Sequence, residues 1–282
     1  MKHKHSILWA MAAIPLLIIA YNKNDAMPST SATTITIENV LDSKLLVESG
    51  SFKNTGASPV VMPGEAISIK FSAAKGQALS FATMYGWSND LFFAPENPGI
   101  KLYQDNGTPV EGDVSAQIKL WDNGTRINQM PGAAVIHPGT TETAPRAITE
   151  VNGTDAQGNT YAPASTLMKA TLHYEGNSNF TLIITNVSGG TTNPTPFSPG
   201  VWAISYSVGG NLLNPNPLFE VGKPSVNGLT NIAEMGDNSV LGNYINTQTG
   251  IFTPLSSICE NKLTCPFIFF FLEFITLSIT FS

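Results

Sequence analysis

Short stretches in which apolar and polar residues alternate recur along most of this chain. Alternation with a period of two predicts strands that bury one face, because successive side chains of a strand point to opposite sides. Residues 78–84 (ALSFATM) are apolar at nearly every position, which indicates a more deeply buried strand. Alternating strands are expected at residues 33–40, 45–47, 66–71, 100–103, 117–121, 167–174, 179–187 and 201–208.

Turn-forming residues separate these stretches. Residues 105–107 (DNG), 111–113 (EGD) and 175–177 (EGN) supply the residue types that tight turns favour. Residues 130–163 form a longer stretch rich in Gly, Pro, Thr and Asn, and loops of this length are commonly functional or mobile. Many short strands joined by turns predict an all-β fold, an antiparallel β-sandwich.

Helical spacing of apolar residues is convincing only at residues 228–244, where Gly236 favours the end of one short helix before the next begins. We therefore expect a sandwich at residues 33–190 and short helices within residues 195–255. That second segment is either a partial second unit or an extension of the sandwich.

The N-terminal segment has the pattern of an export signal. Basic residues precede an apolar run at 7–20 that is short for a membrane span, and polar residues follow from Tyr21. We expect a signal peptide at residues 1–26, with an uncleaved anchor as the alternative. The protein is then exported, to the periplasm, the cell surface or the medium.

The C-terminal segment, 256–282, is unlike the rest of the chain. Its last part, 266–282, is almost wholly apolar and aromatic, with Glu273 as its one charged residue. Three interpretations stay open: a frameshift or truncation near residue 256, a C-terminal membrane anchor, and a core strand. The two cysteines, Cys259 and Cys265, lie in this tail and are able to pair, so the body of the protein has no thiol chemistry.

Composition and motifs narrow the function. The chain has 282 residues, 12% of them charged, and a net charge of −6, which argues against nucleic acid as a partner. Common catalytic and nucleotide-binding motifs are absent, and His137 and His173 are the only histidines after the signal. We therefore expect a protein that is not an enzyme.

Carboxylates cluster at the expected strand ends between residues 80 and 125. Calcium takes six to eight oxygen ligands and mixes carboxylates with backbone carbonyls. Asp90 and Asp122, with a backbone carbonyl near Pro95, are the candidate metal ligands. The alternative is that each carboxylate only stabilises its own turn.

Aromatic residues lie beside these carboxylates. Trp87 and Trp121, together with Glu96 and Arg126, form a candidate ligand-binding surface. A Trp at a strand end more often fills the core, so that interpretation stays open for both.

The chain resembles the spondin domain, the N-terminal module of the F-spondin and mindin proteins, in the form found in exported bacterial proteins. The resemblance spans residues 33–187, and the segments SNDLFF (88–93) and LWDNGT (120–125) are its most specific parts. It implies a β-sandwich similar to calcium-dependent membrane-binding modules, a metal at one pole, and matrix adhesion. Asp90 and Asp122 match the acidic positions of the family, whereas Arg126 stands where an acidic residue is usual.

Three functions follow from these observations. The first is an exported, non-catalytic spondin-type module that binds extracellular matrix, a glycan or a protein ligand, with Ca²⁺ as its candidate cofactor. The second is a structural scaffold without metal, in which Arg126 neutralises the acidic pole. The third is an accessory domain of a secreted hydrolase system. Membrane contact is expected only through the signal or an anchor segment.

Overall fold

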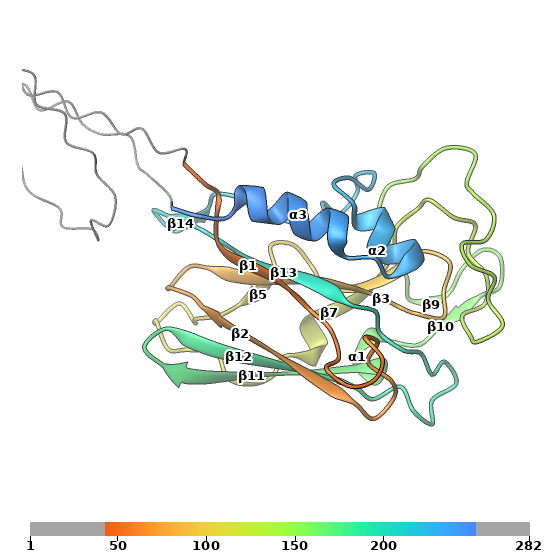
Figure 1. The fold of residues 1–282 in the computed structure, drawn as a ribbon, viewed down its shortest axis with the longest axis horizontal. Helices are drawn as coiled ribbons and strands as arrows, with labels where there is room; N and C mark the ends of the chain where they lie inside the picture. The colour runs from red at the N-terminus through yellow and green to blue at the C-terminus, as the bar shows by residue number, and fades with distance from the viewer. Residues whose placement is uncertain (1–42, 252–282) are drawn as a thin grey trace, which may run out of the picture. The chain divides into compact units, whose positions relative to one another are not determined.

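The structure, a computed structural model, describes residues 43–251. Two antiparallel β-sheets pack face to face, and two helices near the end of this segment cover the outer face of the larger sheet (Figure 1). The predicted all-β sandwich with a small C-terminal helical segment is therefore confirmed. The expected signal at 1–26, the strand at 33–40 and the tail at 256–282 lie outside the described residues.

The larger sheet has seven strands, in the order β1-β13-β3-β4-β7-β8, with β5 paired to β3. The sheet contains β1 (Leu46–Phe52), β3 (Ala78–Met84), β4 (Leu91–Pro95), β5 (Ile100–Lys101), β7 (Ile118–Asp122), β8 (Thr149–Glu150) and β13 (Gly200–Ser205).

The smaller sheet has four strands, in the order β2-β12-β11-β6. These are β2 (Ala66–Ser72), β6 (Gly112–Asp113), β11 (Met168–Gly176) and β12 (Asn179–Asn186). Two short hairpins stand apart from both sheets: β9 (Gly153–Thr154) with β10 (Thr160–Tyr161), and β14 (Ser207–Val208) with β15 (Asn211–Leu212). The helices are η2 (Ser115–Gln117), α1 (Ala164–Leu167), α2 (Leu229–Met235) and α3 (Ser239–Gln248).

Successive side chains along β4 and β7 in the larger sheet alternate between two separate hydrophobic cores, one on each face of the sheet. In β4, Leu91 and Phe93 face the smaller sheet, while Phe92 packs in the second core beneath the helices. In β7, Leu120 belongs to the first core and Trp121 to the second. A sheet covered on both faces explains why β3 and β4 are buried at every residue.

Helices α2 and α3 supply the other side of the second core. Leu229 and Ile232 of α2 and Leu241 and Ile245 of α3 are fully buried against the sheet. The α2 helix ends at Gly236, whose φ of 68° is the left-handed conformation that glycine adopts without strain. The spacing of apolar residues predicted this helix pair and its break.

The sandwich does not end near residue 190 as the sequence analysis expected. Strand β13 lies beyond that point, and it pairs with both β1 and β3 in the interior of the larger sheet. The described residues, 43–251, all belong to one compact unit. The segment after residue 195 thus completes the larger sheet and then covers it.

Two further segments differ from expectation. The turn expected at residues 111–113 contains β6, which pairs with β11 at the edge of the smaller sheet. The long stretch 130–163 contains the strands β8, β9 and β10, each only two residues long. Within residues 43–251, no helix is long and apolar enough to span a membrane.

The position of β13 can be tested with two glycine-to-alanine substitutions of opposite expected sign. A Cβ at Gly200 would collide with the Phe52 ring and the Ala82 carbonyl, so Gly200→Ala is expected to lower the free energy of unfolding by about 1–3 kcal/mol. Gly242 lies inside α3, where a Cβ meets Val201 only at 3.8 Å. Gly242→Ala is expected to raise stability by about 0.5–1 kcal/mol, because alanine favours the helix.

Urea unfolding of both variants measures these changes. A Gly200→Ala protein as stable as the parent would contradict the central placement of β13.

Candidate functional site

The register between β4 and β7 determines where the two candidate metal ligands point. Leu91 pairs with Asp122, so Asp90 lies opposite Asn123, whose backbone N–H donates to the Asp90 carbonyl at 3.1 Å. Paired residues in an antiparallel sheet share a face, and neighbours along a strand face opposite ways. Asp90 and Asp122 therefore meet at one end of the sheet but on opposite faces.

Asp90 lies on the helix-covered face and is fully buried. Its Oδ2 accepts backbone N–H groups from Thr125 at 2.8 Å and Arg126 at 2.8 Å. The other oxygen, Oδ1, is buried without a hydrogen-bond partner among the described residues, and so is Oδ1 of the opposite Asn123. Arg126 Nε, a donor, is also buried here without a partner, so the cluster holds two unsatisfied acceptors and one unsatisfied donor.

The hydroxyl of Thr125 links this cluster to helix α2. Its oxygen lies 3.1 Å from Asp90 Oδ2 and 2.7 Å from Glu234 Oε1, and it accepts the Asn123 side-chain amide at 3.0 Å. One hydroxyl proton cannot be donated to two carboxylates. Arg126 forms an ion pair with the second oxygen of Glu234 at 2.6 Å, so α2 is held to the end of the sheet by charge.

Burial raises the pKa of Asp90 from its ordinary 3.8 to about 6, and the negative charge of Asp122 adds to this rise. The hydrogen bonds from Arg126 and Thr125 oppose it in part. A proton on Asp90 Oδ1 would turn this unsatisfied acceptor into a donor.

Asp122 lies on the opposite face, where a different set of donors surrounds it. Its Oδ1 accepts the backbone N–H of Gly124 at 2.7 Å, and its Oδ2 accepts Asn128 Nδ2 at 2.9 Å and Arg146 Nη2 at 3.0 Å. Arg146 also pairs with Glu142 through Nε at 2.9 Å. The guanidinium thus bridges two carboxylates.

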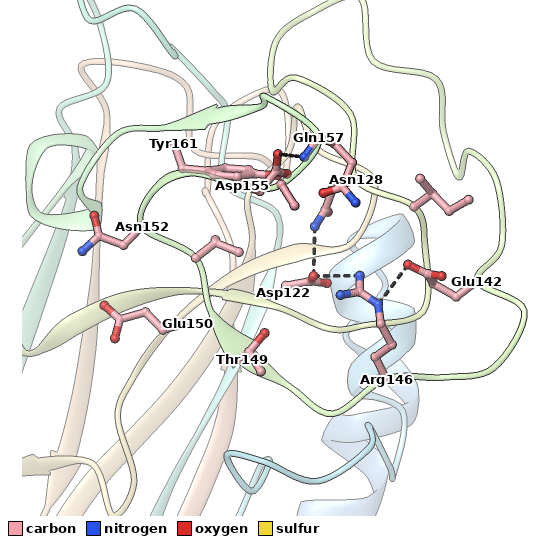
Figure 2. Close-up of a pocket in the computed structure, with 13 residues that line it drawn as sticks. Asp122, Asn128, Glu142, Arg146, Thr149, Glu150, Asn152, Asp155, Gln157 and Tyr161 are labelled. Atoms are coloured by element: carbon pink, nitrogen blue, oxygen red, sulfur yellow. Dashed lines mark hydrogen bonds and ion pairs between the residues drawn. The ribbon is translucent and has the colours of Figure 1, made fainter.

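A cleft of about 530 Å³ opens above Asp122, between β8 and the β9–β10 hairpin (Figure 2). This volume is in the range of ligand-binding pockets, about 300–1,000 Å³. Figure 2 shows Asn152 and Glu150 on the side of the cleft away from Arg146 and Glu142. The lining residues are Asp122, Ile127, Asn128, Glu142, Arg146, Thr149, Glu150, Val151, Asn152, Asp155, Ala156, Gln157 and Tyr161.

Asp155 organises the hairpin wall of the cleft. Its Oδ1 accepts the backbone N–H of Gln157 and Asn159, and its Oδ2 accepts the Tyr161 hydroxyl at 2.7 Å. These donors and the Asn159 side chain lower the pKa of Asp155 in spite of its partial burial, while burial and the bond to Asp155 raise the pKa of Tyr161.

The donor set does not fit the calcium shell expected from the sequence. Asp90 and Asp122 face opposite sides of the sheet, and Asp122 is already bonded to Arg146. Residues 91–95 form a strand and not a loop, and Pro95 pairs with Ile118 at the end of β4 away from Asp122. At the rise of a β-strand, Pro95 is about 13 Å from Leu91. Among residues 43–251, no three His, Cys, Asp or Glu residues are placed to hold a metal.

The four expected ligand-binding residues do not form one surface. Trp121 is buried between the sheet and the helices, packs on Phe219, and donates its indole N–H to the Ala94 carbonyl at 3.0 Å. Trp87 is half-buried against the sandwich core. Glu96 is exposed just after β4, at the end away from Asp122.

Arg126 lies beside the site but points to α2. Its side chain bonds Glu234 and the Thr141 hydroxyl, not Asp90 or Asp122. Arg126 lies beyond the end of β7, where its backbone forms an isolated bridge with Thr141.

The sequence analysis missed most of the residues that build the site. Glu234 and Arg146 were not singled out, although Arg146 lies in the long stretch 130–163 that was expected to be functional or mobile. Asn128 and Asp155 carry no motif. The LWDNGT segment was the signal for Asn123 and Thr125, which belong to it.

Comparisons of this chain with protein families, with characterised proteins and with solved structures found no match. The spondin resemblance therefore stays a prediction.

The proton on Asp90 can be tested by the pH dependence of stability. The pKa in the folded state lies above the ordinary value, so the contribution of Asp90 is fully present below about pH 4 and is lost as pH rises through about 6. Asp90→Asn replaces the protonated form with a neutral isostere. It is expected to raise the free energy of unfolding at pH 8 by about 1–3 kcal/mol and to flatten the change between pH 4 and 6.

Asp113→Asn is the matched substitution, and its effect on stability at neutral pH is expected to have the opposite sign. Hydrogen bonds from Ser115 lower the pKa of Asp113, so its contribution is present at neutral pH and is lost as pH falls. Chemical denaturation of both variants across this pH range is the measurement. A destabilised Asp90→Asn protein at pH 8 would show that the folded state stabilises the ionised carboxylate, which would contradict the raised pKa of Asp90.

Calcium is expected to leave the melting temperature unchanged within about 1 °C, because the carboxylates are already bonded to protein donors. A specific ion at a hundredfold excess over its dissociation constant adds about 2.7 kcal/mol, or roughly 5–10 °C for a domain of this size. Differential scanning calorimetry with calcium and with EDTA is the measurement. A calcium-dependent rise of that size would restore the metal site that the resemblance implies.

Proposed function

We propose that this protein is an exported, non-catalytic binding module of the spondin type, which holds its ligand in the cleft above Asp122. The export signal expected at residues 1–26 and the spondin resemblance support the location and the class. The cleft carries the proposal, because it is a concave site at the end of the sheet where the loops gather.

The side chains of the cleft favour binding over catalysis. Both carboxylates on its floor and hairpin wall, Asp122 and Asp155, accept several hydrogen bonds each. A general base needs a lone pair directed at substrate, and a nucleophile needs an adjacent base. In residues 43–251 neither His137 nor His173 lines the cleft.

A structural scaffold is the second candidate. Arg146 on one face and Arg126 on the other neutralise carboxylates where the resemblance implies a cation. In that case the two arginines only neutralise the carboxylates at this end of the sheet, and the cleft has no ligand.

Filling the cleft separates the two candidates. Ala156 is an exposed lining residue in the hairpin turn, so Ala156→Trp is expected to block the cleft without disturbing the core. The parent protein is expected to bind at least one component in a solid-phase assay on immobilised matrix proteins and glycans. Ala156→Trp is expected to weaken that binding at least about tenfold, a change of about 1.4 kcal/mol.

Ala133→Trp, at an exposed alanine outside the cleft, is the matched control and is expected to bind like the parent. Equal binding by Ala156→Trp and the parent would place the ligand elsewhere. The absence of binding by the parent to every component would favour the scaffold.

A further inference from the structure

The charged groups of the cleft are already paired within the protein. Asp122 is bonded to Arg146 and Asn128, and Glu142 to Arg146. Glu150 forms an ion pair with Lys119 at 3.3 Å. Asp155 accepts hydrogen bonds on both oxygens. An ionic ligand would have to displace one of these partners.

The groups that have unused hydrogen-bonding capacity are uncharged. Within the described part of the chain, the side chains of Thr149, Asn152 and Gln157 line the cleft, are exposed, and have no hydrogen-bond partner. Asn128 donates to Asp122 through its amide nitrogen, which leaves its Oδ1 as a free acceptor. Amides and hydroxyls offer donors and acceptors together, as a ligand rich in hydroxyl groups requires.

Apolar side chains lie among these polar groups. Val151 is half-buried and Ile127 is 43% exposed, and both line the cleft. A sugar ring presents C–H groups on its faces and hydroxyls around its edge, so mixed polar and apolar walls suit it. Sites for small ligands generally combine apolar contact area with a few polar groups that orient the ligand.

The edge of the sheet next to the cleft is poorly suited to an added peptide strand. Strand β8 is two residues long, and the preceding Ile148 already exchanges hydrogen bonds with Gly222 and Lys223 on its outer side. Strand addition needs a free run of backbone donors and acceptors. The side chains, and not the backbone, are therefore the means of recognition.

We propose that the cleft above Asp122 binds a neutral oligosaccharide, oriented by Asn152, Gln157, Thr149 and the Asn128 carbonyl oxygen, with Val151 and Ile127 against its C–H faces. This inference rests on the proposed function and names its ligand class. Because the charged groups of the cleft pair internally, binding depends little on ionic strength.

Isothermal titration calorimetry of the purified full-length protein tests the proposal. The probes are neutral hexasaccharides of glucose, mannose, galactose and N-acetylglucosamine, with hexalysine as a cationic probe and oligogalacturonate as an anionic one. At least one neutral hexasaccharide is expected to bind with the same affinity in low and high salt. Asn152→Ala and Gln157→Ala are each expected to weaken it about five- to tenfold.

Two substitutions outside the cleft serve as matched controls. Asn211 and Gln104 are exposed residues of the same types, in β15 and in the loop after β5, so Asn211→Ala and Gln104→Ala are expected to bind like the parent. Circular dichroism of each variant confirms that the fold is kept.

The possible failures are distinguishable. Salt-sensitive binding of hexalysine alone would overturn the neutral ligand class but keep a binding module. Hexasaccharide binding that is unchanged in Asn152→Ala and Gln157→Ala would overturn the cleft as the site. The absence of binding to any neutral hexasaccharide at millimolar concentration would overturn the glycan assignment, while the solid-phase assay with Ala156→Trp decides separately whether the cleft binds anything.

Discussion

The pairing of Leu91 with Asp122 is the constraint on which the rest of the site depends. Because side chains alternate along a strand, this one register sends Asp90 under the helices and places Asp122, itself buried, beneath the cleft. A shift by one residue would reverse both, and it would also move Phe92 into the first core and Leu91 and Phe93 into the second. Apolar packing in the two cores therefore maintains the register that keeps Asp90 and Asp122 on opposite faces.

Each face neutralises its acidic residue in its own way. On the covered face Asp90 is buried, so it relies on backbone N–H groups, and its raised pKa lets it hold a proton below about pH 6. On the open face Arg146 reaches Asp122 from the long loop, where a half-exposed guanidinium stays hydrated. A shared cation would require both carboxylates on one face.

Alternation of apolar and polar residues was sufficient to predict most strands, because burial on one face leaves a period of two. It was also sufficient for the helix pair around Gly236. It failed at β4, where LFFAP is buried on both faces and so has no alternation, and this error placed Pro95 in the wrong part of the site. The partner of Asp122 was beyond prediction, since Arg146 lies in a stretch without period and approaches only through the folded loop.

The same contacts explain why the C-terminal helices belong to the sandwich. Helix α2 contributes apolar residues to the second core, but it also carries Glu234, which bonds Thr125 and Arg126 just after β7. Apolar packing alone would leave the helix free to shift along the sheet, whereas these directed bonds determine its position at one end. The turn after β7 is thus held from both faces, by Glu234 on one and Arg146 on the other, and a turn held in this way can form a rigid floor for the cleft.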